Sequence, residues 1–137
     1  MDFVQRNGYA NLRCTHIPGC PDEIQLNRHE EWRTSENAMA EVWHHFFPNT
    51  STPDVIGAAC CAQFAVSAEQ VRKRPLSDYQ KFRTWILETQ LNDELSGRIL
   101  EYLWHIIFGQ QAVYCPTHSQ CFHDVYGVDI EVLAEQD

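Results

Sequence analysis

The sequence predicts a single domain of the α+β class, in which helices pack on a small sheet. A length of 137 residues suits one hydrophobic core and is too short for two substantial ones. Aromatic residues make up 12% of the chain, far more than a disordered chain carries. Apolar residues also recur at helical spacing in three segments and form one unbroken run that suits a buried strand. We therefore expect residues 1–137 to fold as one unit with an acidic tail at 128–137.

The first two long elements are a helix and a strand. Residues 28–47 carry apolar side chains at helical spacing, and Asn27 with Glu30 resembles a capping box at the start of this segment. Pro48 ends the helix because a proline cannot continue it. Residues 56–66 are small or apolar without alternation, which is typical of a strand buried on both faces. This strand is expected to form the centre of the sheet.

Two further helices follow the central strand. Ser77 with Gln80 can cap an amphipathic helix over residues 77–89. A helix over residues 96–108 is apolar nearly all round, as a buried helix is, and stops at Gly109. Shorter elements are expected as strands at 9–14, 112–115 and 122–126 and as a helix at 67–73.

Charge and hydropathy exclude two classes of protein. Nineteen acidic against ten basic residues give a net charge of -9, and such a chain lacks the basic surface that nucleic-acid binding requires. No window approaches the roughly 20 consecutive apolar residues that span a bilayer, and the first residues lack the apolar core of a signal peptide. We expect no nucleic-acid partner, no membrane span in this chain and, by default, a cytoplasmic location.

The helix at 96–108 carries the polar residues that favour chemistry most. Arg98, Glu101 and His105 are three and four residues apart, so on one helix they share a side, and we call them the polar stripe. Buried charges must either close into a hydrogen-bonded network or line a cavity. In the second case Glu101 is a general base or carboxylate ligand and His105 its neighbour, with shifted pKa values. Spacing alone leaves both alternatives open.

Six cysteines leave the redox compartment open, because an even count fits both disulfides and reduced thiols. Five residues separate Cys14 from Cys20, and five separate Cys115 from Cys121. Two short-range disulfides, two thiol pairs or one four-thiolate zinc site all fit these spacings. Cys60 and Cys61, in the predicted central strand, are expected to be inert core thiols. The triplet Asn49-Thr50-Ser51 matches a glycosylation sequon, which arises often by chance and decides nothing alone.

Several blocks of the chain resemble a fungal family that is classed only as domain of unknown function 3431. The most specific are CCAQFAVS at 60–67 and EYLWHIIFG at 101–109, supported by 8–14, 18–21 and 96–98. The resemblance covers roughly residues 8–127. Members are longer, with an additional N-terminal half, often behind a membrane anchor, and their pattern is similar to glycosyltransferases of the GT-A type. By this resemblance the chain corresponds to the carboxy-terminal half of a family member. It departs from the family at Ala68, where a basic residue is expected.

The resemblance implies a transferase that acts on a nucleotide sugar and a hydroxyl-bearing glycan or small-molecule acceptor, with a divalent cation as the cofactor by analogy. Gln63 and Ser67 would bind substrate on the acceptor side, and Glu101, His105 and Trp104 would lie near the sugar donor. Two other functions remain open. One is a noncatalytic binding or accessory protein that forms a homo-oligomer to bury the surface its missing half would cover. The other is a small acid-base or metal-dependent enzyme that uses Glu101 and His105.

Overall fold

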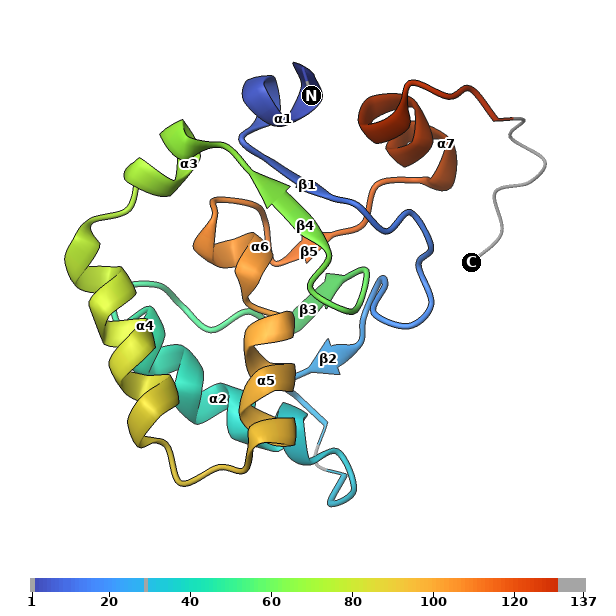
Figure 1. Cartoon of the computed structure of the whole chain (residues 1–137). Coiled ribbons are helices and arrows are strands. Elements are labelled where there is room, and N and C mark those ends of the chain that lie inside the picture. The colour runs from blue at the N-terminus through green and yellow to red at the C-terminus, as the bar shows by residue number, and fades with distance from the viewer. Residues whose placement is uncertain (1, 29, 131–137) are drawn as a thin grey trace.

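A computed structural model describes residues 2–28 and 30–130, and the helices and strands within these ranges form an α+β fold (Figure 1). The elements in chain order are α1 (Asp2–Asn7), β1 (Tyr9–Asn11), β2 (Ile24–Gln25), α2 (Thr34–Phe46), β3 (Val55–Ala58), β4 (Phe64–Val66), α3 (Ala68–Arg72), α4 (Leu76–Glu88), α5 (Asp93–Glu101), α6 (Trp104–Ile107), β5 (Val113–Tyr114), α7 (His118–Cys121) and the π-helix η1 (Phe122–Tyr126). The predicted fold class is confirmed. Most of the acidic tail at 128–137 lies outside the described residues.

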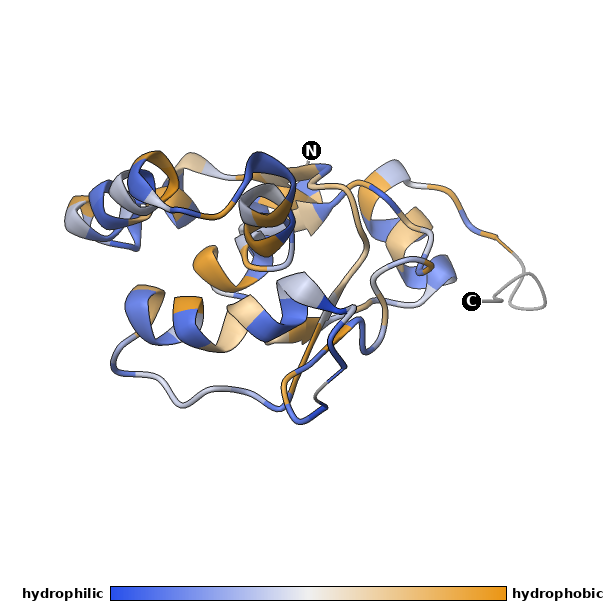
Figure 2. Cartoon of the chain, turned by 90° about the horizontal axis from the view of Figure 1, so that it is seen from below, coloured by the Kyte–Doolittle hydropathy of each residue, from blue (hydrophilic) through white to orange (hydrophobic). Residues whose placement is uncertain are grey.

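The strands form two small sheets instead of one. β1 pairs antiparallel with β4, with Tyr9 opposite Val66. The order in the other sheet is β2-β3-β5, in which β2 runs antiparallel and β5 parallel to β3. The hydrophobic core lies between these sheets and helices α2, α4 and α5, which Figure 1 places together at one end of the molecule, with α1 and α7 at the other. Figure 2 shows hydrophilic and hydrophobic residues alternating along the helices, as amphipathic helices require.

The predicted central strand at 56–66 is wrong as a single element. It consists of β3 and β4, which belong to different sheets and are joined by residues 59–63. A disulfide links Cys60 to Cys61 within this connection. Neighbouring side chains of a strand point to opposite faces, so adjacent bonded cysteines cannot lie in an extended strand. Cys61 and Ala62 instead have φ values of 87° and 51°, which turn the chain from one sheet to the other.

Helix boundaries were predicted well at one helix and poorly at two. α4 (Leu76–Glu88) differs by one residue at each end from the prediction of 77–89. α2 begins at Thr34 instead of residue 28, because the Arg28 side chain turns back to the Glu36 carboxylate and holds the preceding segment as a turn. The predicted helix at 96–108 is two helices, α5 and α6.

The break between α5 and α6 falls at Tyr102 and Leu103, both of which are buried. A straight helix that is apolar all round must be enclosed on every side. The break lets each short helix bury its own side, so α5 buries Ile99 against α2 and α6 buries Ile107. Gly109 ends α6 with a φ of 92°, as predicted, because a left-handed residue after a helix favours glycine.

Three smaller predictions also have clear outcomes. Ser67 caps α3 as expected, and β5 lies within the predicted strand at 112–115. The predicted strand at 122–126 is wrong, because this segment continues α7 as the π-helix η1.

In the described parts of the chain, no helix is long and apolar enough to cross a bilayer.

Candidate functional site

The structure does not bring the polar stripe together. Arg98 lies on the exposed side of α5, Glu101 is half-buried at the last residue of α5, and His105 is buried on α6. The three residues would share a side only if one helix continued through Tyr102 and Leu103. Because the chain turns there, Arg98 and His105 face different surroundings. Catalytic roles for Glu101 and His105 stay predictions that this geometry does not support.

His105 connects α6 to the strand that follows it. Its side chain is 1% exposed, and Nε2 lies 2.8 Å from the carbonyl oxygen of Ala112. A carbonyl only accepts hydrogen bonds, so Nε2 carries the proton and Nδ1 is the bare nitrogen, which is buried without a partner in the described residues. Burial disfavours the charged imidazolium and lowers the pKa of His105 to about 4, although the Ala112 bond opposes this shift. His105 is therefore a neutral structural residue at neutral pH.

A pH-dependent loss of stability should follow from the buried His105. An unfolded histidine takes up a proton near its ordinary pKa of 6.5, whereas folded His105 does so only near 4. Between these values the unfolded chain binds more protons, so stability falls as the pH falls from 6.5 to about 4. The shift corresponds to about 3 kcal/mol. Urea unfolding at several pH values measures this decline.

The matched variants for this test are His105→Gln and His45→Gln. A glutamine at 105 can donate to the Ala112 carbonyl without titrating, so His105→Gln should flatten the decline between pH 6.5 and 4. His45 is exposed on α2, and its replacement should leave the wild-type decline in place. An equal decline in the wild type and His105→Gln would show that another group controls this range.

The predicted substrate-binding residues Gln63, Ser67 and Trp104 lie around β4 and mainly support the fold. Gln63 is exposed, and its carbonyl oxygen accepts a bond of 2.7 Å from the Leu12 amide. Ser67 is buried and its hydroxyl accepts from the Gln70 amide at the start of α3. Trp104 is half-buried with its ring 5.7 Å from that of Phe64. Substrate contacts by these residues stay predictions.

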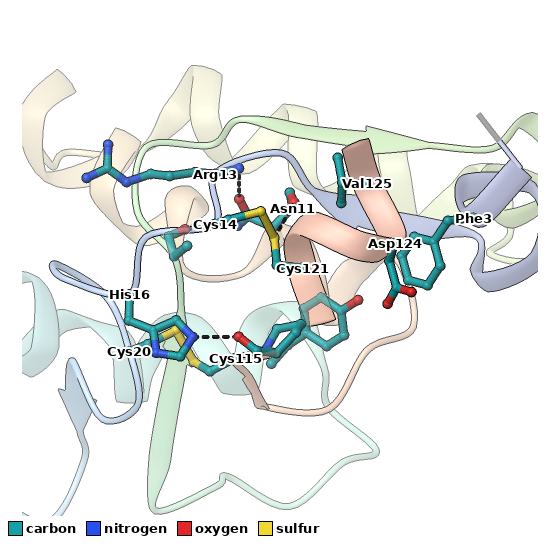
Figure 3. Close-up of a pocket in the computed structure, with 13 residues that line it drawn as sticks. Phe3, Asn11, Arg13, Cys14, His16, Cys20, Cys115, Cys121, Asp124 and Val125 are labelled. Atoms are coloured by element: carbon teal, nitrogen blue, oxygen red, sulfur yellow. Dashed lines mark hydrogen bonds between the residues drawn. A yellow bond between two sulfur atoms is a disulfide. The ribbon is translucent and has the colours of Figure 1, made fainter. Parts of the chain in front are cut away.

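The cysteines form disulfides with long-range pairing. Cys14 is bonded to Cys121 and Cys20 to Cys115, across 107 and 95 residues of sequence (Figure 3). The two short-range pairs, the thiol pairs and the zinc site considered from the spacing are therefore not what the structure contains. The five-residue spacing within each sequence pair suits two segments that lie side by side and are joined by two disulfides. It suits a local loop closed by its own disulfide equally well, so the spacing could not decide between them. The prediction of core thiols at Cys60 and Cys61 is also wrong, because these two are bonded to each other.

The two long-range disulfides line a small enclosed cavity. Its volume is about 20 Å³, and His16 Nε2 contacts the carbonyl oxygen of Pro116 beside it (Figure 3). A cavity needs about 10–15 Å³ to hold one water molecule. This cavity therefore has room for a water and not for a substrate. In the described residues no three His, Cys, Asp or Glu side chains form a metal-binding group, and the divalent cation stays an expectation from the resemblance.

A polar cleft is a better candidate site, and it lies where β2, the start of α2 and α5 meet. Its volume is about 210 Å³. Arg98, from the polar stripe, is the member of this site that the sequence predicted. The lining residues are Glu23, Ile24, Trp32, Arg33, Thr34, Ser35, Glu36, Arg98 and Tyr102, and we call this the Arg98 cleft.

One wall of the Arg98 cleft is an ion network around Glu36. The side chain of Glu36 is 2% exposed, and its two oxygens lie 2.9 Å from Arg28 Nε and 3.1 Å from Arg33 Nε. The Gln25 amide donates a third bond at 2.9 Å. Burial alone would raise the pKa of the Glu36 carboxyl, but the bonds from Arg28, Gln25 and Arg33 together lower it. The network ties β2 to α2 and holds Glu36 ionised.

The opposite wall offers donors without partners. The Arg98 guanidinium makes no hydrogen bond or ion pair with the described residues. Tyr102 is 3% exposed, and its hydroxyl likewise has no hydrogen-bond partner in the described part of the chain. Burial raises the pKa of Tyr102, and the charges of Glu101 and Glu23 add to the rise. Although most of the residue is buried, its hydroxyl oxygen is accessible from the cleft, so this phenol can form a hydrogen bond with a ligand.

The start of α2 adds further donors to the same cleft. Arg33 precedes the first turn and provides no side-chain cap, so the first amides of this 13-residue helix have no intrahelical acceptor. The hydroxyls of Thr34 and Ser35 lie beside them. The exposed ring of Trp32 borders the cleft under the Arg33 guanidinium, 4.8 Å away. Chemically, this arrangement can bind an anion through amides and guanidinium groups and present an aromatic face next to it.

Most of the Arg98 cleft was missed because the helix start was placed too early. Thr34 and Ser35 followed by Glu36, ahead of an apolar run, are the signal of a helix N-terminus at this point. The pair Asn27 and Glu30 looked like an equally good start. No local pattern indicated that α5 would bring Arg98 and Tyr102 to the same place.

Comparison with known proteins gives one finding. The model of the family "Protein of unknown function (DUF3431)" matches residues 1–124 of the chain. No curated protein and no solved structure matches it. The fungal origin, the relation to glycosyltransferases and the correspondence to a carboxy-terminal half stay expectations. Because the match covers most of the sequence, the chain belongs to the DUF3431 family of proteins of unknown function.

Proposed function

We propose that this protein binds a hydroxyl-bearing anion, of the class of sugar phosphates, in the Arg98 cleft. The observation that carries the proposal is the unpartnered hydroxyl of Tyr102 on the same cleft as the unpaired Arg98 guanidinium. Both groups are donors that a ligand in the cleft can reach, and a hydrogen bond to a charged group contributes about 1.5–3 kcal/mol. A phosphate has acceptor oxygens for Arg98, Tyr102 and the first amides of α2 together.

The sugar part of the ligand is supported by the rest of the lining. Glu23 is 39% exposed and can accept bonds from ligand hydroxyls. The Trp32 ring offers an apolar face of the kind against which a sugar ring packs, and it is 71% exposed. Both carboxylates of the described lining are paired with arginines, Glu36 with Arg28 and Arg33, and Glu23 with Arg33 at 3.9 Å. This supports binding more strongly than catalysis.

The transferase and the noncatalytic binding protein both include this binding step. In the transferase, the Arg98 cleft would hold the phosphate side of a nucleotide sugar while an acceptor hydroxyl attacks the sugar. In the accessory protein, the ligand would only be held. A preference for a nucleotide sugar over a hexose 1-phosphate, with release of the nucleotide on addition of an acceptor, would favour the transferase.

Thermal unfolding with added ligand tests the proposal. We expect hexose 1-phosphate or a nucleotide sugar to raise the melting temperature of the wild type, because a ligand that binds the native state stabilises it by mass action. Arg98→Gln should weaken binding at least about tenfold, since a hydrogen bond to a charged group contributes about 1.5–3 kcal/mol. Arg83→Gln, on the exposed side of α4, makes the same charge change and should leave binding unaltered.

Tyr102→Phe separates a ligand contact from a structural role. The change removes a hydroxyl that has no partner in the described residues and is accessible from the cleft, so the free protein should be about as stable as the wild type. Binding should nevertheless weaken. Unchanged stability with a loss of binding identifies a ligand contact and not a structural role. Unchanged binding in both Arg98→Gln and Tyr102→Phe would exclude the Arg98 cleft as the site.

A further inference from the structure

The turn that follows α2 presents the sequon Asn49-Thr50-Ser51 to solvent. The Thr50 amide donates to the Phe47 carbonyl at 3.1 Å, so Pro48 and Asn49 are the two central residues of a β-turn. Asn49, Thr50 and Ser51 are all exposed. The side-chain amide of Asn49 makes no hydrogen bond with the described residues. A sequon alone is weak evidence, because such triplets arise often by chance, but this one lies where an enzyme and a glycan can reach it.

The turn is also held in place from the core. Trp43 Nε1, on the last part of α2, donates to the Thr50 carbonyl at 3.0 Å, and the Trp43 side chain is buried. This bond directs the sequon away from the core. Asn49 borders an open hollow of about 320 Å³ between the turn and α4. The folded protein therefore has room for sugars attached at this position.

The cysteines provide an independent argument about the compartment. All six are in disulfides and none is free. Disulfides form and persist in oxidising compartments such as the lumen of the endoplasmic reticulum, and are rare in the cytosol. The cytoplasmic location expected by default is thus disfavoured. The lumen that oxidises cysteines is also the compartment in which asparagine is glycosylated.

We infer that Asn49, exposed on the anchored turn after α2 of a fully disulfide-bonded chain, is an N-glycosylation site. The glycan comes from a lipid pyrophosphate-linked oligosaccharide. The Asn49 side-chain nitrogen bonds to C1 of the first sugar while the bond from C1 to the pyrophosphate oxygen breaks. The amide loses one proton, and the lipid pyrophosphate leaves. Ser51 provides the hydroxyl at the second position after asparagine that the sequon requires.

The glycan would not block the Arg98 cleft. Asn49 follows the C-terminal end of α2, whereas the cleft is at its N-terminal end. Thirteen residues of helix separate these ends by roughly 20 Å. The modification is therefore independent of ligand binding, and each can be tested without the other.

The test is to produce the full chain with a secretion leader in a eukaryotic host. We expect the secreted wild type to carry a glycan that an asparagine-specific glycanase removes, converting Asn49 to aspartate in the mass spectrum. Asn49→Gln and Ser51→Ala should lack this mass. The matched control Thr50→Ala keeps the sequon and the backbone carbonyl that Trp43 contacts, so it should stay glycosylated. Cell-free translation with microsomes gives the same comparison for a variant that is not secreted.

Three results would overturn the inference. One is a secreted wild type with all six cysteines oxidised and the mass of the bare polypeptide. The other is recovery of the wild type with free thiols, because the argument about the compartment would then be wrong. A glycan that persists in Asn49→Gln would assign the modification to another residue and reject Asn49.

Discussion

Removing both long-range disulfides should abolish folding near neutral pH. The bond from Cys14 to Cys121 closes a loop of 107 residues, and loops of about 100 residues correspond to about 4.7 kcal/mol in the chain-entropy model. The bond from Cys20 to Cys115 lies inside this loop, so the second closure involves only a ring of roughly 15 residues, or about 3 kcal/mol. Together they approach the whole stability of a typical domain, about 5–15 kcal/mol.

The nested arrangement also predicts how the two losses combine. If either pair is replaced by alanines, the other pair still closes the long loop, so each change alone should cost only about 3 kcal/mol. Replacing both pairs should therefore cost more than the sum of the single pairs. Urea unfolding measures the cost of each single pair, and the variant without both pairs should show no cooperative unfolding transition.

The pair Cys60 and Cys61 is the matched control for the disulfides. Its bond joins neighbouring residues, so it closes almost no chain, and replacing both with alanine should cost much less than either long-range pair. If the variant without both long-range bonds unfolds at the same urea concentration as the wild type, those bonds do not support the fold.

Replacement of Glu36 by alanine should lower the free energy of unfolding by about 1–3 kcal/mol. The change leaves the Arg28 and Arg33 guanidinium groups and the Gln25 amide without their shared acceptor. The Arg28 and Arg33 side chains are 28% and 18% exposed, so water can solvate them and the loss should be smaller than for a fully buried ion pair. Since the folded pKa of Glu36 is lowered, its contribution is present above the ordinary carboxyl value of 4.5 and is lost as the pH falls through the folded pKa.

The comparison residue for Glu36 is Glu41 on the same helix. Glu41 is exposed, so Glu41→Ala should change stability by less than about 0.5 kcal/mol. Below the ordinary carboxyl value of 4.5 the difference between Glu36→Ala and the wild type should shrink, because the unfolded wild-type chain takes up a proton at Glu36 that the folded state resists. A difference that stays constant from pH 7 to 3 would show that the loss comes from packing and not from the ion network.

Local patterns predicted the elements whose ends depend on their own residues. α4 coincides with an amphipathic run, although its N-cap is Pro75 and not the predicted Ser77, and α6 stops at a glycine that adopts a left-handed conformation. Both signals act within a few residues. The start of α2 instead depends on Arg28 reaching Glu36, and the division of 56–66 depends on a bond between Cys60 and Cys61. Contacts of this kind override local propensity. Thr34 and Ser35 did signal the later start of α2, but Asn27 and Glu30 gave a competing signal.

The candidate site shows the same limit. Arg98 was selected because a charge in an apolar helix needs a partner, and it does line the Arg98 cleft. His105 was selected by the same argument, yet its partner is a backbone carbonyl of a neighbouring segment. Tyr102 was taken as a core residue because it is apolar over most of its surface, and its hydroxyl became important only once the cleft was known. Sequence spacing could not distinguish these three outcomes.

Amide chemical shifts measured during a titration with hexose 1-phosphate test the central claim most directly. The account predicts saturable shifts confined to the lining of the Arg98 cleft, at residues 23–25, 32–36 and 98–102, and their loss in Arg98→Gln. Inorganic phosphate should perturb the start of α2 and Arg98 while leaving Trp32 nearly unchanged. Saturable shifts centred on 46–50 and 74–81, around the other end of α2, would contradict the account.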